Sequence, residues 1–355
     1  MAERARVLIA GGSGVFGRLL ARELLRTTTA HLILAGRSLP ALAAAREELG
    51  FPDRISITAL DLGDPESLTR AARGCVAVAC AAGPFQGLSL ELPRAAVRAG
   101  AHWVDISDHE GWVIPLLDDT TLDAAARDAG LAVIPGLSTV PALSGALARW
   151  ARERLPAAVG ARVTLFIGNR NAKGPGAIAS ALSNGFRHPT RVDLPMGRRL
   201  AYLGRSPDAE LFRRELDLHA EFRVVLGWGP AGLFVSGLGR LWPRLGDRER
   251  SGLAHLLSAL SLPFGWFGSQ GGCLLVELWD DARRMSVAAL SSDQRLAILP
   301  CAMAVEHLVK DELHERGVVH PVGWLSPASW ISEIGGRGVR ILQRTQEDPH
   351  LRPVV

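Results

Sequence analysis

The sequence of 355 residues contains only four cysteines, and their spacing limits what they can do. They are Cys75, Cys80, Cys273 and Cys301, with no Cys-x-x-Cys pair and no histidines at the spacing of metal ligands. A zinc site is therefore not expected, and we predict no metal centre. Scattered cysteines of this kind are typical of buried free thiols in a reducing compartment.

An excess of charge of one sign is also lacking, because the formal net charge is only +4. Arginine supplies most of the positive charge, and the lysines are Lys173 and Lys310. No dense basic cluster carries interleaved aromatic residues, so nucleic acid is not an expected partner. The N-terminus leads directly into the first expected strand and leaves no room for a signal peptide, which predicts a cytoplasmic protein.

Long uninterrupted hydrophobic runs are missing as well. Residues 251–276 carry no charged side chain apart from a histidine, but Pro263 and several glycines break the run. We therefore expect no transmembrane span. The wider stretch 227–270, rich in aromatic residues and glycine, is expected to form domain core or the interface of a homodimer. The alternatives are an apolar lid over a bulky substrate and a patch in peripheral contact with a membrane.

The sequence does contain a glycine-rich turn close to its N-terminus. Residues 7–10 are an apolar run suited to a buried strand, and the apolar spacing of residues 16–25 predicts a helix. Glycine between them lets the backbone approach a pyrophosphate, and the helix start supplies free N–H groups. This context predicts a dinucleotide site. Its residues are Gly11, Gly12, Ser13, Gly14, Val15, Phe16 and Gly17.

The next expected strand, 31–36, is followed by Arg37 and Ser38. These residues lie about 20 positions beyond the glycine turn, where dinucleotide-binding domains recognise the ribose. Arg37 can pair with a 2′-phosphate and Ser38 can donate a further bond, so we predict NADP (NADPH) rather than NAD. The alternative is that Arg37 is a solvated surface arginine.

Two later loops are expected to complete the cofactor site. Asp61 and Leu62 follow the third strand and are expected near the adenine, although Asp61 could instead cap the following helix. Residues after the fourth strand should lie near the nicotinamide, because ligands bind beyond the carboxyl ends of the strands. These are Ala82, Gly83, Pro84 and Phe85.

Strands and helices alternate through the first part of the chain and then cease to alternate. The alternation predicts an α/β fold with a Rossmann doubly wound parallel sheet over residues 1–136, the NADP-binding domain. Later strands at 162–168, 272–279 and 285–291 predict an α+β domain on a mostly antiparallel sheet. Its predicted extent is 137–320, with roles in substrate binding and dimerisation.

Several segments together resemble the saccharopine dehydrogenase superfamily, in its branch of saccharopine dehydrogenase-like oxidoreductases. The segments are 11–17 (GGSGVFG), 35–38 (AGRS), 81–85 (AAGPF), 103–108 (WVDISD), 135–141 (PGLSTVP), 173–180 (KGPGAIAS) and 316–321 (RGVVHP). The resemblance implies a Rossmann domain, an inserted second domain, and a C-terminal segment, 321–355, that packs back on the first domain.

Two segments depart from the pattern of that family. Members often carry Gly-Glu where this chain has Asp108 and His109. They often carry an acid between the positions of Gly136 and Pro141, where this chain has none. Both positions are expected to face the substrate, so the amino-acid substrates of the family are not carried over.

Hydride transfer needs placement and one proton donor or acceptor. The single tyrosine, Tyr202, is not followed by the lysine of a Tyr-x-x-x-Lys pair, which excludes the mechanism of short-chain reductases. The best candidates follow the fifth strand and are Asp105, Asp108 and His109. The alternatives are a structural hydrogen bond for Asp105 and a surface position for His109.

These observations predict an NADP-dependent oxidoreductase that reduces a C=N or C=C bond of a small, fairly apolar metabolite. Two alternatives stay open. One is a non-catalytic NADP-binding scaffold, and the other is a lyase or synthase that uses the nucleotide transiently. NADPH oxidation by a substrate would separate the first alternative from the prediction.

Overall fold

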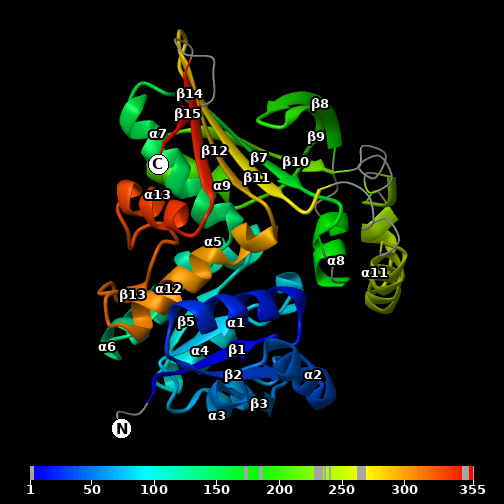
Figure 1. Cartoon of the computed structure of the whole chain (residues 1–355), viewed down its shortest axis with the longest axis vertical. Helices are drawn as coiled ribbons and strands as arrows, with labels where there is room; N and C mark the ends of the chain where they lie inside the picture. Colours follow the sequence, from blue (N-terminus) through cyan, green and yellow to red (C-terminus); the bar gives the residue numbers. More distant parts are fainter. Residues whose placement is uncertain are drawn as a thin grey trace. The chain divides into compact units, whose positions relative to one another are not determined.

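The computed structural model describes residues 4–171, 175–183, 187–227, 235, 237–239, 241–261, 269–345 and 352–354. The chain divides into two compact units, each with its own sheet (Figure 1). The first unit consists of Met1–Ala142 and Ala297–Trp324, and the second of Leu143–Leu296 and Leu325–Val355.

The first unit is built on a seven-stranded sheet with the order β13-β6-β5-β4-β1-β2-β3. Its strands are β1 (Arg6–Ala10), β2 (His31–Gly36), β3 (Ile55–Ala59), β4 (Ala77–Cys80), β5 (His102–Asp105), β6 (Ala132–Ile134) and β13 (Gly317–Val318). Every neighbouring pair is parallel, which confirms the predicted doubly wound sheet. The order reverses between β1 and β4, and such switch points are where dinucleotides bind.

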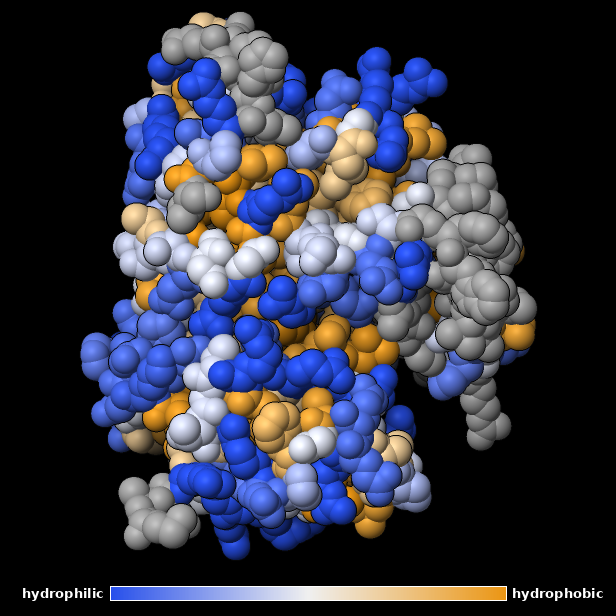
Figure 2. All heavy atoms as spheres, viewed as in Figure 1, coloured by the Kyte–Doolittle hydropathy of each residue, from blue (hydrophilic) through white to orange (hydrophobic). Residues whose placement is uncertain are grey.

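Helices follow these strands and cover the sheet. They are α1 (Val15–Thr27), α2 (Leu39–Leu49), α3 (Pro65–Ala72), α4 (Glu91–Arg98), α5 (Glu110–Leu117), α6 (Thr120–Asp128) and α12 (Leu299–Val309), with short turns η1 (Pro52–Arg54), η2 (Phe85–Gly87) and η3 (Thr139–Leu143). Side chains of β1 from Val7 to Ala10 are fully buried, as expected for a parallel strand covered on both faces. Hydrophilic side chains predominate over the lower part of Figure 2, where helices of this unit lie.

The second unit has an eight-stranded sheet with the order β15-β14-β12-β11-β7-β10-β9-β8. Its strands are β7 (Gly160–Ile167), β8 (Arg187–Leu194), β9 (Gly197–Leu203), β10 (His219–Leu226), β11 (Gly272–Trp279), β12 (Arg284–Ser291), β14 (Arg340–Thr345) and β15 (Arg352–Pro353). Among the described strands of this second sheet only β7 and β10 pair in parallel, so the predicted α+β unit on a mostly antiparallel sheet is confirmed.

One face of this sheet is covered by helices. The helices of the unit are α7 (Ser144–Arg154), α8 (Pro175–Ser183), α9 (Asp208–Leu216), α11 (Asp247–Ser261) and α13 (Pro327–Gly336), with turns η4 (Trp242–Arg244) and η6 (Gln294–Ala297). Helix α7 contacts β11 and β12, α9 contacts β10, and α13 contacts α7 and β14. An apolar cluster of this unit includes Phe166 on β7, Leu275 on the neighbouring strand β11, and Val192 on β8 at the edge of the sheet.

The C-terminal part of the chain corrects the predicted domain boundaries. Helix α12 contacts α1, β4 and β5, and β13 pairs with β6, so residues 297–324 complete the first unit. Within that unit Asp123 Oδ1 accepts a hydrogen bond from Val318 N at 2.8 Å. The boundary predicted at residue 320 therefore misplaced this segment, which in sequence is continuous with the second unit.

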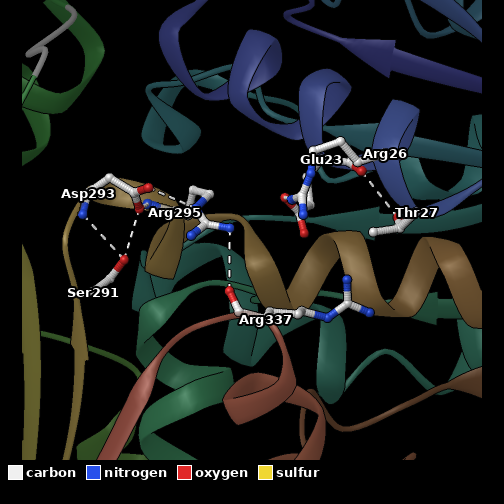
Figure 3. Close-up of polar contacts among 7 residues, drawn as sticks. All are labelled: Glu23, Arg26, Thr27, Ser291, Asp293, Arg295 and Arg337. Carbon is white, nitrogen blue, oxygen red and sulfur yellow. Dashed lines mark hydrogen bonds and ion pairs between the residues drawn. The ribbon is translucent and has the colours of Figure 1, made fainter.

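The prediction that residues 321–355 pack back on the first domain is wrong for residues 325–345. Strand β14 pairs with β12 along six residues and so extends the second sheet. The end of α13 is tied to the same unit, because Arg295 Nη1 donates to Arg337 O at 3.5 Å and Arg295 Nε lies 2.8 Å from Asp293 Oδ2 (Figure 3). The strand that pairs with β12 thus comes from near the C-terminus of the chain, and no local sequence pattern predicts such a long-range pairing.

Only part of the aromatic stretch 227–270 is described. Trp242 is buried in a small cluster with Leu182 and Ala254, which fits the expectation of domain core. Residues 228–234 and 262–268 lie outside the described residues, as does Lys173. Among the residues that the structure describes, no helix is both long and apolar enough to cross a membrane. The four cysteines are free and buried, as predicted.

Candidate cofactor and active site

The glycine turn between β1 and α1 is held by contacts that only glycine permits. Gly11 N and Gly12 N both donate to Ala35 O, at 2.9 and 3.1 Å. Gly11 has φ +80°, and a Cβ placed on it would lie 2.8 Å from Ala82 Cα. A Cβ on Gly17 would overlap Gly11 O. The turn after β1 is thereby pressed against the loop after β4, on both sides of the switch point.

Gly14 differs from the other glycines of the turn because a side chain placed on it would point into largely unoccupied space. A Cβ on Gly14 would meet only Gly11 O, at 3.1 Å, among the described atoms. Gly14 is also the N-cap of α1, and no side chain caps that helix. The N–H groups of the first helical turn, at Val15 and Phe16, therefore remain available to a ligand. Open space beside uncapped N–H groups fits a pyrophosphate.

Arg18 was not predicted to contribute to the site, yet it stabilises the glycine turn through a hydrogen bond to its backbone. Its Nη1 donates to Ser13 O at 2.6 Å, and its Nε lies 3.3 Å from Glu48 Oε2. Glu48 also receives a bond from Arg22, at 3.0 Å. Arg18 follows Gly17 directly, so an arginine at this place in a glycine-rich motif is the signal that could have identified it.

Arg37 and Ser38 lie where the sequence predicts, directly after β2. Arg37 is exposed and makes no hydrogen bond or ion pair within the described part of the chain. Ser38 caps α2, because its Oγ accepts from Ala41 N at 3.3 Å. Its hydroxyl hydrogen can still be donated. An arginine held away from acidic partners beside a hydroxyl donor fits a 2′-phosphate.

Asp61 and Leu62 follow β3 at the same edge of the sheet. Asp61 is exposed, and its Oδ1 accepts from Gly63 N at 2.9 Å. The helix cap that was the alternative role for Asp61 is provided by Asp64, which accepts from Glu66 N at 3.0 Å. Asp61 therefore keeps its second carboxylate oxygen on the surface, and Leu62 is half-buried.

The loop after β4 is anchored by Phe85. Ala82 is half-buried, whereas Gly83 and Pro84 are exposed. Phe85 is buried, and its ring centroid lies 5.4 Å from that of Trp112, tilted by 60°. Of the four residues predicted near the nicotinamide, Phe85 thus packs into the core, whereas Ala82, Gly83 and Pro84 stay accessible.

Asp105, the last residue of β5, is the centre of a buried hydrogen-bond network. Its Oδ2 accepts from the indole Nε1 of Trp103 at 2.9 Å and of Trp112 at 2.8 Å. Its Oδ1 accepts from Ser107 N at 2.9 Å and Gly136 N at 3.0 Å. The side chain is 0% exposed. This arrangement matches the structural alternative, because Asp105 joins the loops after β5 and β6.

Burial has a clear electrostatic consequence around Asp105. It raises the pKa of the Asp105 carboxyl above the ordinary value, while the four hydrogen bonds oppose that rise. Cys80, opposite Asp105 in the sheet register, has its pKa raised to about 12 by burial and then by the Asp105 charge. The negative charge of Asp105 therefore disfavours a second negative charge on the Cys80 thiol, at the carboxyl end of β4.

Asp108 and His109 follow in the loop between β5 and α5. Asp108 is exposed, yet desolvation by surrounding protein raises the pKa of its carboxyl. His109 is the N-cap residue of α5, and its N donates to Ser107 Oγ at 3.1 Å. A Cβ on Gly111 would lie 2.8 Å from His109 Cε1, so the ring lies over the first turn of the helix. His109 is half-buried rather than fully exposed.

Comparison with known proteins agrees with this geometry. Residues 7–134 match the family described as "Saccharopine dehydrogenase NADP binding domain". The first unit carries a saccharopine dehydrogenase NADP-binding domain. The resemblance predicted from sequence is thereby confirmed for these residues of the first unit.

One curated protein and one solved structure extend the comparison. Over 137 residues this chain is 26% identical to a "Trans-acting enoyl reductase" of Mycobacterium ulcerans (strain Agy99). That match covers 38% of this chain and only 33% of the relative. The fold resembles apo saccharopine dehydrogenase (L-Glu forming) from Saccharomyces cerevisiae, with a TM-score of 0.66 and 12% identity over 96% of this chain and 99% of the other.

In this NADP-binding domain the predicted residues fall into two groups. The glycine turn, Arg37 and Asp61 lie at the carboxyl ends of β1, β2 and β3. The residues after β4 and β5 lie on the other side of the switch point, and Asp105 joins the loop after β5 to the loop after β6. Trp112 and Gly136, which complete that network, were not predicted as partners of Asp105. Trp112 lies on the next helix, and Gly136 lies 31 positions away, beyond the next strand.

Proposed function

We propose that this chain is an NADPH-dependent reductase. The observation that carries the proposal is the open side of Gly14 beside the uncapped start of α1, with the unpaired Arg37 at the end of the neighbouring strand. Arg37 supports NADP over NAD because an acidic residue at that position would repel the 2′-phosphate. Asp61 and Leu62 would lie beside the adenine, and Ala82, Gly83 and Pro84 beside the nicotinamide.

The reaction proposed is reduction of a C=C bond next to a carbonyl in a small, fairly apolar substrate. The family supplies hydride chemistry, and the relative named as an enoyl reductase favours C=C over C=N. NADPH supplies a hydride to one carbon, and a proton must reach the other. Asp108 and His109 are the proton donors that we propose, since both follow β5 at the carboxyl edge and neither is fully buried.

The test follows NADPH absorbance while the purified chain is mixed with α,β-unsaturated thioesters or with cyclic imines. We expect stoichiometric NADPH oxidation with a thioester and formation of the saturated product by mass spectrometry. Oxidation with imines only would identify a C=N reductase. Tight NADPH binding without turnover of either class would contradict the reductase and favour a scaffold.

Three further properties belong to the proposal and depend on no contact in the structure. We propose that the chain forms a homodimer, that it is cytoplasmic, and that it makes peripheral contact with a membrane. Light scattering of the purified chain measures the first property, and flotation with vesicles measures membrane contact.

A further inference from the structure

The donors around Asp105 decide its ionisation state. All four bonds to its oxygens come from N–H groups, two of them indoles and two of them backbone amides. An N–H group donates and cannot accept. A protonated carboxyl would need an acceptor for its own hydrogen, and the four donors leave no such position. The geometry therefore requires the carboxylate form.

This carboxylate has no cationic partner. Its four hydrogen-bond donors are neutral, and no ion pair of Asp105 occurs among the described residues. Asp105 is fully buried, so water screens its charge little. Asp105 is thus a buried, uncompensated negative charge at the carboxyl edge of the parallel sheet.

The strand order fixes where that charge lies in relation to the cofactor. Asp105 is paired with Cys80 at the end of β4, and the loop after β4 contacts the glycine turn after β1. Two strand spacings of about 4.8 Å separate β1 from β5. Because Arg37 places the adenosine half on the β2 side, the nicotinamide half extends toward β4 and β5. Asp105 is a fully buried charge on that side.

We propose that Asp105 tunes the electrostatics of the bound cofactor by stabilising the oxidised nicotinamide. Loss of hydride gives the ring a positive charge, whereas the reduced ring is neutral. A fixed negative charge therefore favours NADP⁺ over NADPH and lowers the energy of hydride transfer to the substrate. The inference rests on the proposed function, because it requires NADP(H) to bind at the β1–β4 switch point.

The expected magnitude follows from Coulomb's law. At about 10 Å and an effective dielectric of about 20–40, one charge changes the relative affinity of the two cofactor forms by about 5- to 15-fold. The quantity to measure is the ratio of Kd for NADP⁺ to Kd for NADPH, by titration calorimetry without substrate. We expect Asp105→Asn to raise this ratio by that factor.

Two further variants separate charge from structure. Trp112→Phe removes one N–H donor but keeps the carboxylate, so its charge is less neutralised and the ratio should fall by about twofold. Asp123→Asn makes the same chemical change elsewhere in the first unit and should leave the ratio unchanged. A merely structural role for Asp105 would weaken both cofactor forms alike in Asp105→Asn and in Trp112→Phe.

The outcomes are distinct. An unchanged ratio in folded Asp105→Asn, shown by near-ultraviolet circular dichroism, overturns the proposal. If that variant does not fold, an unchanged or increased ratio in Trp112→Phe overturns it instead. Failure of the wild-type chain to bind either form contradicts the proposed function itself.

Discussion

Two fully buried aspartates, one in each unit, differ in the kind of group that surrounds them. Asp105 accepts only from N–H groups. Asp208, at the start of α9, accepts from the hydroxyls of Ser144 at 2.7 Å and Ser206 at 3.0 Å. A hydroxyl can turn and accept, whereas an N–H cannot. Asp208 can therefore take up a proton and stay hydrogen-bonded, and Asp105 cannot.

The pKa of Asp208 agrees with this difference. Burial raises it to about 6, and the two serine hydroxyls only partly oppose the rise. Burial alone therefore does not determine whether a carboxyl stays charged. The type of hydrogen-bond donor around it, N–H or hydroxyl, determines whether it can accept a proton. We infer that Asp105 stays charged and acts on the bound cofactor, whereas Asp208 affects only the stability of the second unit. Variants should therefore separate cofactor affinity from stability.

The largest expected effect is the loss of cofactor binding in Gly14→Val. The side chain would fill the open side of the turn and block the N–H groups of α1, and losing two charge-assisted bonds of about 1.5–3 kcal/mol each weakens binding by more than about 100-fold. Titration of NADPH measures this loss. Gly336→Val, in α13 of the second unit, is the control, because a Cβ there meets nothing within 4 Å. Normal NADPH binding by Gly14→Val would place the pyrophosphate elsewhere.

The next effect concerns turnover and leaves binding intact. Removing a general acid lowers turnover by about 10²–10⁴-fold, and we expect this for His109→Ala or Asp108→Asn once a substrate is found. The Kd for NADPH should change little, because both residues lie beyond β5. Gly111→Ala should give a milder loss, since its Cβ displaces the His109 ring. Full activity in both His109→Ala and Asp108→Asn would reject this proton-donor site.

The features that sequence predicts well are local. The glycine turn, the α1 start and Arg37 lie within about 30 consecutive residues, where strand, turn and helix signals support one another. The hairpin of β11 and β12 is also local and appears as predicted. In contrast β8 and β9 were missed, because their exposed positions carry many arginines and show little apolar alternation.

The remaining features depend on contacts between distant residues. Asp105 and Gly136 are 31 positions apart, and their bond joins two loops that no local pattern connects. The same holds for β14, whose partner β12 ends about 50 positions earlier. Strand pairing of this kind depends on how much apolar surface the whole sheet buries, and the residues of the strand alone do not determine it. The boundaries at residues 297 and 325 could not be predicted for that reason.

A third prediction tests Asp208 through pH. Its pKa is about 6 in the folded chain and near 3.8 when unfolded, so the folded state binds more protons between these values. The free energy of unfolding therefore falls as pH rises from about 4 to 6, by about 3 kcal/mol in total. Asp208→Asn should lose this contribution and keep NADPH affinity. Denaturant unfolding at several pH values measures it, with Asp193→Asn on β8 as control. An unchanged pH dependence in Asp208→Asn would show that its carboxyl is ionised throughout.

The mildest effect returns to the first unit and concerns Arg37. Arg37→Ala removes the partner of the 2′-phosphate, which costs about 1.5–3 kcal/mol of binding free energy and weakens NADPH by about 10- to 150-fold. NADH lacks that phosphate, so its Kd should not change, and neither should the stability of either unit. Arg73→Ala is the matched control, because Arg73 is exposed but lies before β4, at the opposite edge of the sheet. Equal wild-type affinities for NADPH and NADH would reduce Arg37 to a surface arginine and remove the cofactor preference from the first unit.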